Sequence, residues 1–575
     1  MLRRVALIAA LAGCARPSTA PSPNAPYDIV ITNGRIVDGT GNAWYYGDVG
    51  IRGERIARIT PAGMLAGART ARRIDAKGLV VAPGVIDIQA HSEDALLGGD
   101  SRVVSMITQG VTTMIMGEGD TPGQMSQRMY DEWLKDFTTM RRTSVGGDTS
   151  LVSVLKSFVG PKGFDVWLNA MERRGASVNI GSFIGAGGVR QYAKGMAEGA
   201  PTAAELDTMR MVVRAAMQDG AFGLASALIY PPGNYASTEE LIEQAKVMAP
   251  YGGLYITHMR SEGDRFVEAV DETIRIGREG GVPAEIYHLK AAGVKNWPKM
   301  RTVIAKIDSA RAAGQDITVD QYPYTAGSNN LSSCIPPWAH ADGKLLDRLR
   351  DPAMRTRIRA EMTSENATFE SLCMAATPQG VEVVGFTVDS LMKYDGKRLP
   401  EIAQAWSKDW PDALMDLTLL ERNRLGQVIF VASDSNIAMQ VKLPYMKFGT
   451  DAGGYDPDSS HGATHPRAYG TYPRILGRFV REYHWLTLED AVRKMSGATA
   501  ARLSITDRGL VREGMFADLM IFDPNTIVDR ATYEKPHQIS TGVIHVLVNG
   551  TPVVSDRKVT GAKPGHIVRG PGYRR

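Results

Sequence analysis

The stretch Leu79-Val-Val-Ala-Pro-Gly-Val-Ile-Asp-Ile-Gln-Ala-His-Ser-Glu93 decides the fold of this 575-residue chain. An apolar run meets a Pro-Gly break, and a short strand with several β-branched residues then begins at Val85. Side chains alternate between the two faces of a strand, so Asp87, Gln89 and His91 share one face and the isoleucines share the other. A polar face that ends in a histidine is typical of a barrel strand that reaches a metal site.

The length of the chain allows a large core and more than one domain. Hydrophobic residues make up 43% of the chain and charged residues 22%, as in an ordinary soluble globular protein. The formal net charge is only +4, which gives no reason to expect a nucleic-acid partner. No apolar stretch of the sequence approaches the roughly 20 residues that a membrane-spanning helix needs.

Residues 1–26 have the pattern of a targeting segment and tether. Two arginines precede a short apolar run, and Leu11-Ala12-Gly13-Cys14 then resembles a bacterial lipobox. This pattern predicts a lipoprotein with acyl chains on Cys14, which would be its only contact with a membrane. We therefore expect the protein in the bacterial cell envelope, facing the periplasm, and Ala15 is compatible with sorting to the outer membrane. The alternative is an ordinary secretory signal peptide that is cut nearby.

Two further cysteines, Cys334 and Cys373, lie far apart in the sequence. An oxidising periplasm would permit a disulfide between them. Two separate buried thiols are the alternative, because free cysteine is often buried.

Strand-rich sequence at both ends of the chain flanks a long middle part. Residues 27–81 carry strand candidates around an Asn-Gly turn, and residues 504–575 show the same type of sequence again. In residues 82–503, short apolar strands alternate with helical patterns, which predicts a parallel α/β barrel. The stretch from about 332 to 424 is long and carries charged helical patterns, so we expect an inserted subdomain over the barrel mouth.

Nine short segments are candidates for the strands of this barrel, one more than an eight-stranded barrel uses. They begin at Val85, Thr112, Ser177, Gly223, Gly253, Ala284, Asp316, Gln427 and Lys447. One of the nine is therefore expected to lie outside the barrel. Active sites of such barrels lie at the carboxyl ends of the strands, so polar residues that follow these segments are candidates for chemistry.

Several such residues could bind a metal. His258 and His288 end two consecutive strand candidates, which predicts that both imidazoles lie near His91. Glu118 stands between two glycines that let the backbone bend sharply, and Asp451 follows the last strand. Each residue alone has a plain structural interpretation, either a hydrogen-bonded histidine or a surface turn. Their common placement favours a site.

The first strand resembles that of the amidohydrolase superfamily, and the order of motifs resembles the N-acyl-D-amino-acid deacylase (D-aminoacylase) family. The matching stretches cover nearly all of the chain after the tether: Gln109-Gly-Val-Thr-Thr113, Tyr230-Pro-Pro-Gly233, Thr257-His-Met-Arg260, His288-Leu-Lys290, Asp320-Gln-Tyr-Pro-Tyr-Thr-Ala-Gly-Ser328, Gly449-Thr-Asp451 and His465-Pro-Arg-Ala-Tyr-Gly-Thr-Tyr-Pro-Arg-Ile-Leu-Gly-Arg-Phe-Val-Arg-Glu482. The resemblance implies an α/β fold, a (β/α)8 TIM barrel with a small β-sandwich domain built from both chain ends. It also implies zinc-dependent hydrolysis of an N-acyl-D-amino acid to a carboxylate and a free D-amino acid.

The chain departs from the family at its metal ligands. The superfamily usually has a His-x-His pair where this chain has Gln89-Ala-His91, and the family commonly ligates zinc with a cysteine where this chain has Glu118. A carboxylate is an acceptable zinc ligand, so the resemblance implies a main zinc on Glu118, His258 and His288, with His91 and Asp451 nearby. A neutral amide is a poor zinc ligand. One zinc is therefore expected to bind tightly, and a second weakly or not at all.

The resemblance also implies roles for the residues around the metal. Asp451 would take a proton from the attacking water and return it to the leaving amine. The carboxylate of the amino acid needs a cation and hydrogen-bond donors. The candidates are Lys290, Ser328, Arg467, Arg260 and one of Tyr322 and Tyr324, whose spacing does not choose between them. An ordinary salt bridge is the alternative for each cation.

Three positions outside the metal ligands bear on function or on packing. Gly185-Ala-Gly187 replaces the Gly-His-Gly that the family often shows near the barrel mouth, which bears on the choice of substrate. His465 could cover the site or serve only packing, and His545 lies in a terminal strand where a structural role is expected.

Two other functions fit the sequence. The enzyme could be a dipeptidase or could hydrolyse another linear or cyclic amide. Alternatively, the missing histidine and cysteine could mark an inactive, lipid-anchored binding protein, which would hold no metal.

Overall fold

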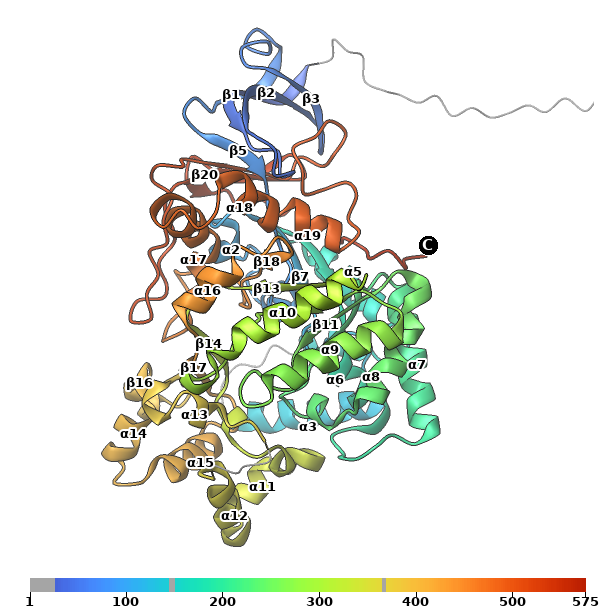
Figure 1. Cartoon of the computed structure of the whole chain (residues 1–575), viewed down its shortest axis with the longest axis vertical. Helices are drawn as coiled ribbons and strands as arrows, with labels where there is room; N and C mark the ends of the chain where they lie inside the picture. The colour runs from blue at the N-terminus through green and yellow to red at the C-terminus, as the bar shows by residue number, and fades with distance from the viewer. Residues whose placement is uncertain (1–25, 144–149, 365–368, 575) are drawn as a thin grey trace, which may run out of the picture.

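The structure is a computed structural model that describes residues 26–143, 150–364 and 369–574. It has three parts along its long axis (Figure 1): a sheet made from both chain ends, a central barrel, and an inserted subdomain at the opposite end from the sheet. Within the described ranges, no helix has both the length and the apolar character to cross a membrane. The predicted signal, with Cys14, lies outside the described residues.

A nine-stranded sheet joins the two ends of the chain. Its path is β22-β21-β20-β19-β5-β1-β2-β3, with β4 beside β1. The strands are β1 (Tyr27–Ile36), β2 (Tyr45–Arg52), β3 (Arg55–Pro61), β4 (Thr70–Asp75), β5 (Val80–Pro83), β19 (Leu519–Phe522), β20 (Val543–Val548), β21 (Thr551–Ser555) and β22 (Lys558–Val559). The antiparallel pair of β5 and β19, in which Val81 faces Ile521, links the two ends. β-Branched residues such as Ile29 and Ile31 are buried in its core.

Eight parallel strand positions form the barrel. The strands are β6 (Val85–Asp87), β7 (Val111–Met116), β8 (Asn179–Ser182), β9 (Ile184–Gly185), β10 (Gly223–Ala227), β11 (Leu254–His258), β12 (Ala284–Ile286), β13 (Ile317–Gln321) and β18 (Met446–Phe448). β8 and β9 are one strand position, interrupted only at Phe183. They connect the β6-β7-β8 sheet to the sheet that runs from β9 to β18. A parallel bridge between Ala90 and Ala452, just beyond β6 and β18, closes the ring.

Helices follow most barrel strands and cover the outside of the barrel (Figure 1). They are α1 (Glu93–Leu97), α2 (Val104–Ile107), α3 (Gln127–Thr143), α4 (Ser150–Lys156), α5 (Gly163–Arg174), α6 (Ala186–Lys194), α7 (Ala203–Gln218), α8 (Thr238–Met248), α9 (Phe266–Gly280), α10 (Lys299–Ala312), α16 (Asp434–Gln440), α17 (Arg467–Arg474), α18 (Leu488–Met495) and α19 (Gly497–Arg502). A capping box of Thr202 and Glu205 starts α7, and Gly281, with φ of 68°, ends α9. These local signals set where each helix begins and ends.

The insert has a sheet of its own, ordered β14-β17-β15-β16 and antiparallel throughout. Its elements are β14 (Ala326–Asn330), β15 (Val381–Val384), β16 (Lys397–Arg398), β17 (Gly426–Phe430), α11 (Leu345–Arg350), α12 (Pro352–Met362), α13 (Leu372–Ala375), α14 (Leu399–Ala405) and α15 (Trp410–Leu420). The strand candidate at Gln427 is β17, so it is the ninth segment and lies outside the barrel. Strands β14 and β17 lie just outside the predicted range 332–424. A disulfide joins Cys334 and Cys373 and settles the choice between a bond and two thiols.

Candidate active site

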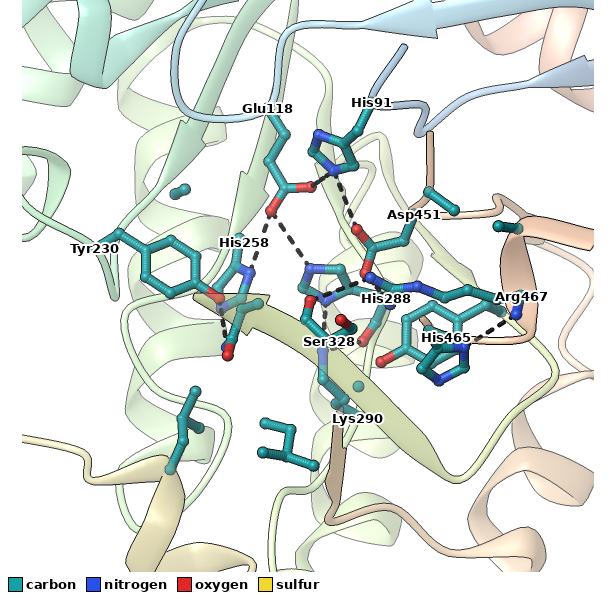
Figure 2. Close-up of a pocket in the computed structure, with 18 of the residues that line it drawn as sticks. His91, Glu118, Tyr230, His258, His288, Lys290, Ser328, Asp451, His465 and Arg467 are labelled. Atoms are coloured by element: carbon teal, nitrogen blue, oxygen red, sulfur yellow. Dashed lines mark hydrogen bonds and ion pairs between the residues drawn. The ribbon is translucent and has the colours of Figure 1, made fainter. Parts of the chain in front are cut away.

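The candidate active site lies where the barrel strands end. A cavity of about 350 Å³ is lined by His91, Glu118, His258, His288 and Asp451, which follow or end β6, β7, β11, β12 and β18. Figure 2 shows these side chains converging from different strands. The placement is that of active sites in parallel barrels.

Glu118 lies at the centre of two possible metal-binding groups, one with His258 and His288 and one with His91 and Asp451. In each group the donor atoms lie within 4.8 Å of one another. Its Oε1 is 3.2 Å from Nδ1 of His258 and 3.5 Å from Nε2 of His288. Its Oε2 is 3.4 Å from Nε2 of His91, which is in turn 3.1 Å from Oδ1 of Asp451. One carboxylate can therefore serve both groups.

The backbone around Glu118 depends on its flanking glycines. Gly117 has φ of 104° and Gly119 has φ of 78°, a region that side chains other than glycine rarely adopt. A Cβ on Gly117 would lie 2.3 Å from the carbonyl oxygen of Phe183. Only glycine fits there, and the turn directs the carboxylate of Glu118 into the cavity.

His288 and Asp451 also have left-handed backbone conformations, with φ of 34° and 51°. Such strain persists where the surroundings hold it, and it is concentrated at functional sites. Buried Asp320 accepts the backbone N–H of His288 at 2.7 Å, and buried Asp87 accepts that of Thr450 at 2.9 Å. These two aspartates hold the strand ends that carry His288 and Asp451.

Glu118 and Asp451 have lowered pKa values, which keeps both carboxylates ionised. Burial would raise the pKa of Glu118, but hydrogen bonds from His258, His288 and His91 outweigh burial and keep that pKa well below its usual range. Burial would likewise raise the pKa of Asp451, yet the Arg467 guanidinium and His91 lower it. Ionised carboxylates beside imidazoles are the charge pattern that a divalent cation requires.

The pKa values of the two histidines on neighbouring strands shift in opposite directions. Burial alone would lower the pKa of His288, but Glu262 and Glu118 raise it to about 9. The pKa of His258 is lowered, chiefly by burial. The Nε2 atom of His258 is buried and has no hydrogen-bond partner among the described residues.

The donor set fits zinc. Two imidazoles and a carboxylate are a ligand set that zinc accepts in catalytic sites. The ionised Glu118 supplies the negative charge, and Nδ1 of His258 and Nε2 of His288 lie 3.2 and 3.5 Å from its Oε1. Glu118, His258 and His288 would hold the ion.

Gln89 takes the place of the missing histidine and is bound to Glu118. Its Nε2 donates to Oε2 of Glu118 at 2.5 Å. This hydrogen bond occupies the oxygen that faces His91 and Asp451. The second group therefore has a hydrogen-bond donor competing for one of its carboxylate oxygens.

Four of the predicted substrate-binding residues line the cavity, namely Lys290, Tyr322, Ser328 and Arg467. Arg467 donates to Oδ2 of Asp451 at 2.5 Å and to the backbone oxygen of Ser328 at 3.1 Å. Its guanidinium lies 4.7 Å from the ring centre of Tyr322. The hydroxyl of Tyr322 has no partner among the described residues, so it is free to donate to a bound carboxylate.

The other two predicted binding residues, Tyr324 and Arg260, lie outside this cavity. Tyr324 packs under Arg474, whose guanidinium is 4.8 Å from its ring centre. Arg260 pairs with Glu272 at 2.9 Å and donates to the backbone oxygens of Asn234 and Ala236, which is the salt-bridge alternative. Neither residue therefore lies in the cavity that holds the metal-binding group, although Arg260 lines the cavity beside it.

Ala186 and His465 both have structural contacts. Ala186 lines neither this cavity nor the larger one beside it, and its neighbour Gly187 donates its backbone N–H to the oxygen of Gly119 at 2.7 Å. Ala186, where the sequence differs from the family pattern, therefore lies next to the turn that carries Glu118 and outside both cavities. His465 lines the cavity, while its ring bonds the backbone of Ala326 and Arg467.

Sequence reasoning assigned no role to Glu262 or Tyr230, yet both line the cavity. Glu262 accepts from Lys290 Nζ at 2.6 Å and lies 3.0 Å from Nδ1 of His288. It thus orients a ligand histidine through the nitrogen that faces away from Glu118. The signal for Glu262 was its spacing of four residues from His258, and the signal for Tyr230 was its position after β10.

Comparisons with known proteins agree with this geometry. Residues 446–554 match the model of a family described as "Amidohydrolase family". The chain is 31% identical to a D-aminoacylase of Alcaligenes xylosoxydans xylosoxydans over 95% of its length and 98% of the relative's. It is 32% identical to an N-acyl-D-glutamate deacylase of the same organism, over 94% of its length and 96% of the relative's.

Solved structures show the same fold. The structure of an N-acyl-D-glutamate deacylase from Bordetella bronchiseptica, complexed with zinc and a phosphonate inhibitor, matches with a TM-score of 0.76 at 28% identity. The match covers 95% of this chain and all of that one. A D-aminoacylase structure matches with a TM-score of 0.74 at 30% identity, over the same shares of the two chains.

Proposed function

We propose that this chain, which belongs to the D-aminoacylase family of amidohydrolases, cleaves N-acyl-D-amino acids into a carboxylic acid and a free D-amino acid. Members of this family are hydrolases of carbon–nitrogen bonds in linear amides other than peptide bonds, and the chain is one of them. One observation carries the proposal. Ionised Asp451 lies between His91 and Arg467, beside the group of Glu118, His258 and His288. This arrangement supplies a proton acceptor next to a zinc-binding group and an anion-binding cation.

The residues of the site divide the reaction between them. Glu118, His258 and His288 would hold a zinc ion, which would supply Lewis acidity to the amide carbonyl and lower the pKa of the attacking water. Asp451 accepts a proton from this water and gives it to the leaving amine, so that the amine departs neutral. Arg467 and the free hydroxyl of Tyr322 bind the carboxylate of the amino acid. Lys290, fixed by Glu262, adds positive charge to the same wall of the cavity.

We also propose that a single zinc is bound tightly. A solved D-aminoacylase structure, 30% identical with a TM-score of 0.75, is described as having a binuclear metal centre in which one metal activates and the second attenuates. In this chain Gln89 replaces an imidazole and bonds Glu118, which supports a weak or absent second site.

The test combines metal content with activity on matched substrates. Purified protein lacking residues 1–26 should hold about one zinc per chain and should hydrolyse N-acetyl-D-amino acids in preference to their L-enantiomers. Glu118→Ala should lose the zinc and the activity. Asp451→Asn should keep the zinc and lose activity by at least about a hundredfold, since it removes the proton acceptor. Zinc binding without hydrolysis of any D- or L-substrate would contradict the proposal.

For the location of the protein we propose a lipid anchor at Cys14 in the cell envelope, facing the periplasm. The disulfide between Cys334 and Cys373 supports an oxidising compartment. The full-length protein should incorporate labelled palmitate and sediment with membranes, and Cys14→Ser should do neither. Labelling that persists in the Cys14→Ser variant would contradict an anchor at this residue.

A further inference from the structure

The segment between β19 and β20 leaves the terminal sheet and reaches the barrel. These two strands are antiparallel neighbours, with Leu519 opposite Leu547. Neighbours of this kind need a connection of only about two to five residues, yet residues 523–542 connect them here. Residues 523–542 form what we call the C-terminal loop. Ordered loops of this length within a compact domain usually serve a function.

Asp529 of the C-terminal loop binds two arginines. Its side chain is 1% exposed, and its carboxylate accepts from Arg474 at 2.9 Å and from Arg478 at 3.0 Å. Arg474 is the last residue of α17, and Arg478 lies one turn further on, in the π-helix η8 (Ile475–Glu482). The carboxylate lies between two positive charges, which would repel each other without it.

The helix that Asp529 holds begins with the residue proposed to bind the substrate carboxylate. α17 has eight residues from Arg467 to Arg474, a length of about 10 Å. A Cβ on Gly470, in the middle of α17, would lie 2.9 Å from the Cβ of Asp529 and 2.5 Å from the hydroxyl oxygen of Tyr324. The helix therefore packs directly on Asp529. Because a short helix moves as a unit, the position of its last residue bears on that of its first.

Arg474 also reaches the strand end that carries Tyr322. Its Nε donates to the backbone oxygen of Pro323 at 2.8 Å, and Pro323 directly follows Tyr322. The ring centre of Tyr322 lies 4.7 Å from the guanidinium of Arg467. Asp529 thus acts on both members of the carboxylate site, on Arg467 through α17 and on Tyr322 through Arg474.

Tyr533 of the C-terminal loop contacts the other end of α17. Its ring centre lies 5.3 Å from that of His465 and 4.8 Å from that of Phe430 in β17. His465 accepts the backbone N–H of Arg467 at 3.0 Å, and Figure 2 shows the two residues side by side. The loop therefore supports residues at both ends of the helix.

We propose that Asp529 is a positioning residue for the reaction, which fixes Arg467 and Tyr322 where they can bind the carboxylate of the substrate. The described lining of the two cavities does not include Asp529, so it acts without touching the substrate. The inference rests on the proposed function, because it concerns the same carboxylate site. The alternative is that Asp529 only fastens the terminal sheet to the barrel. Its loss would then lower stability and would affect every substrate alike.

Two substrates separate these roles. N-acetyl-D-leucine carries a carboxylate, whereas N-acetyl-D-leucinamide has the same acetyl amide bond without the negative charge. For both compounds, kcat/KM of the zinc-loaded protein is measured from the amine released. Asp529→Asn should lower the ratio of kcat/KM for the acid to kcat/KM for the amide by about tenfold, because small displacements of a binding group have effects of this order or larger. An unchanged ratio would overturn the inference, whatever the loss of stability.

The two arginines provide matched variants. Arg474 bonds both Asp529 and Pro323, whereas Arg478 bonds Asp529 and Tyr483. Arg474→Gln should lower the ratio as Asp529→Asn does, and Arg478→Gln should leave it near the wild-type value. Equal effects of the two substitutions would contradict a path through Arg474. This comparison also decides the question if Asp529→Asn does not fold.

Crystal structures test the inference without catalysis. In the wild type Arg467 should donate to Asp451, at 2.5 Å in this structure, and in Asp529→Asn its guanidinium should be displaced from Asp451. An unmoved Arg467 in the variant would overturn the inference. If the wild type hydrolyses no N-acetyl-D-amino acid, that result contradicts the proposed function instead, and the two structures still decide whether Asp529 positions Arg467.

Discussion

Gln89 is bonded to Glu118, the residue that the two possible metal-binding groups share. Its amide donates to Glu118 at the oxygen that faces His91 and Asp451. The amide is neutral and binds zinc poorly beside imidazole. We therefore expect this single side chain to determine whether the second group, which shares Glu118 with the first, can hold an ion.

Gln89→His should restore the second metal. Because the new imidazole adds a ligand and removes the bond to Glu118, we expect zinc content to rise from about one to about two per chain. Metal analysis after dialysis measures this directly. Gln89→Leu is the matched control, since it removes the bond but adds no ligand, and it should stay near one. A Gln89→His protein with one zinc would show that Gln89 does not set the stoichiometry.

His340 makes the stability of the protein depend on pH. Burial lowers its pKa from 6.5 to about 4. Below pH 6.5 the unfolded chain binds a proton at His340 that the folded chain does not, so this contribution is complete above pH 6.5 and is lost as the pH falls toward 4. The loss at pH 5 is about 2 kcal/mol for one histidine shifted in this way.

Urea unfolding at pH 7.5 and pH 5 measures the effect of His340. His340→Gln should reduce the loss of stability between the two pH values, because glutamine does not titrate. Exposed His461 provides the control variant His461→Gln, which should behave like wild type. An unchanged pH dependence in His340→Gln would rule out His340 as its source.

At the scale of elements, the insert depends on its disulfide as well as on its own core. The bond joins residues 39 apart, Cys334 beside β14 and Cys373 in α13. Closing a loop of that length restricts the unfolded chain and is worth about 4 kcal/mol in the chain-entropy model. Both ends lie next to residues that line the larger cavity.

Replacing both cysteines by serine should destabilise the insert more than the barrel. Limited proteolysis should cut within residues 331–424 faster in the double variant, and a reducing agent should produce the same change in the wild type. The reducing agent should have no effect on the variant, which is the control. Equal rates of cleavage in wild type and variant would mean that the insert does not need the bond.

The sequence predicted the metal group because each ligand directly follows a parallel strand, and such strands end together. It could not exclude Gln427 from the barrel strands, because an antiparallel strand with the same apolar run has the same local pattern. Nor could it choose between Tyr322 and Tyr324, since residues two apart share a strand face. The pairing of Arg260 with Glu272, on the following helix, is a contact between elements that local patterns do not show.

At the scale of the whole molecule, a buried polar network ties the barrel to the terminal sheet. Asp518 pairs with Arg508 and accepts from Asn179 of β8 at 3.1 Å and from the backbone of Asn549 at 2.7 Å. Asp518 is 3% exposed and Arg508 4%. The two folded parts are thus joined by charges that water does not reach.

Asp518→Asn should destabilise the entire protein by about 3–5 kcal/mol, because it leaves the Arg508 charge buried without its partner. Chemical denaturation followed by tryptophan fluorescence gives the free energy of unfolding. Asp207→Asn removes one partner of an exposed pair with Arg210, and as a control it should cost less than about 1 kcal/mol. Similar stabilities for the two variants would contradict a linking role for Asp518.

A carboxylate ligand at Glu118, in place of a cysteine, should make zinc binding resistant to oxidants. Thiolates are converted stepwise to sulfenic and sulfinic acids, and a zinc centre that depends on a cysteine loses its ligand in that process. The chain has three cysteines, of which Cys334 and Cys373 are bonded to each other, and the metal group uses only oxygen and nitrogen donors. Hydrogen peroxide at a dose that strips zinc from a cysteine-ligated relative should leave this centre loaded.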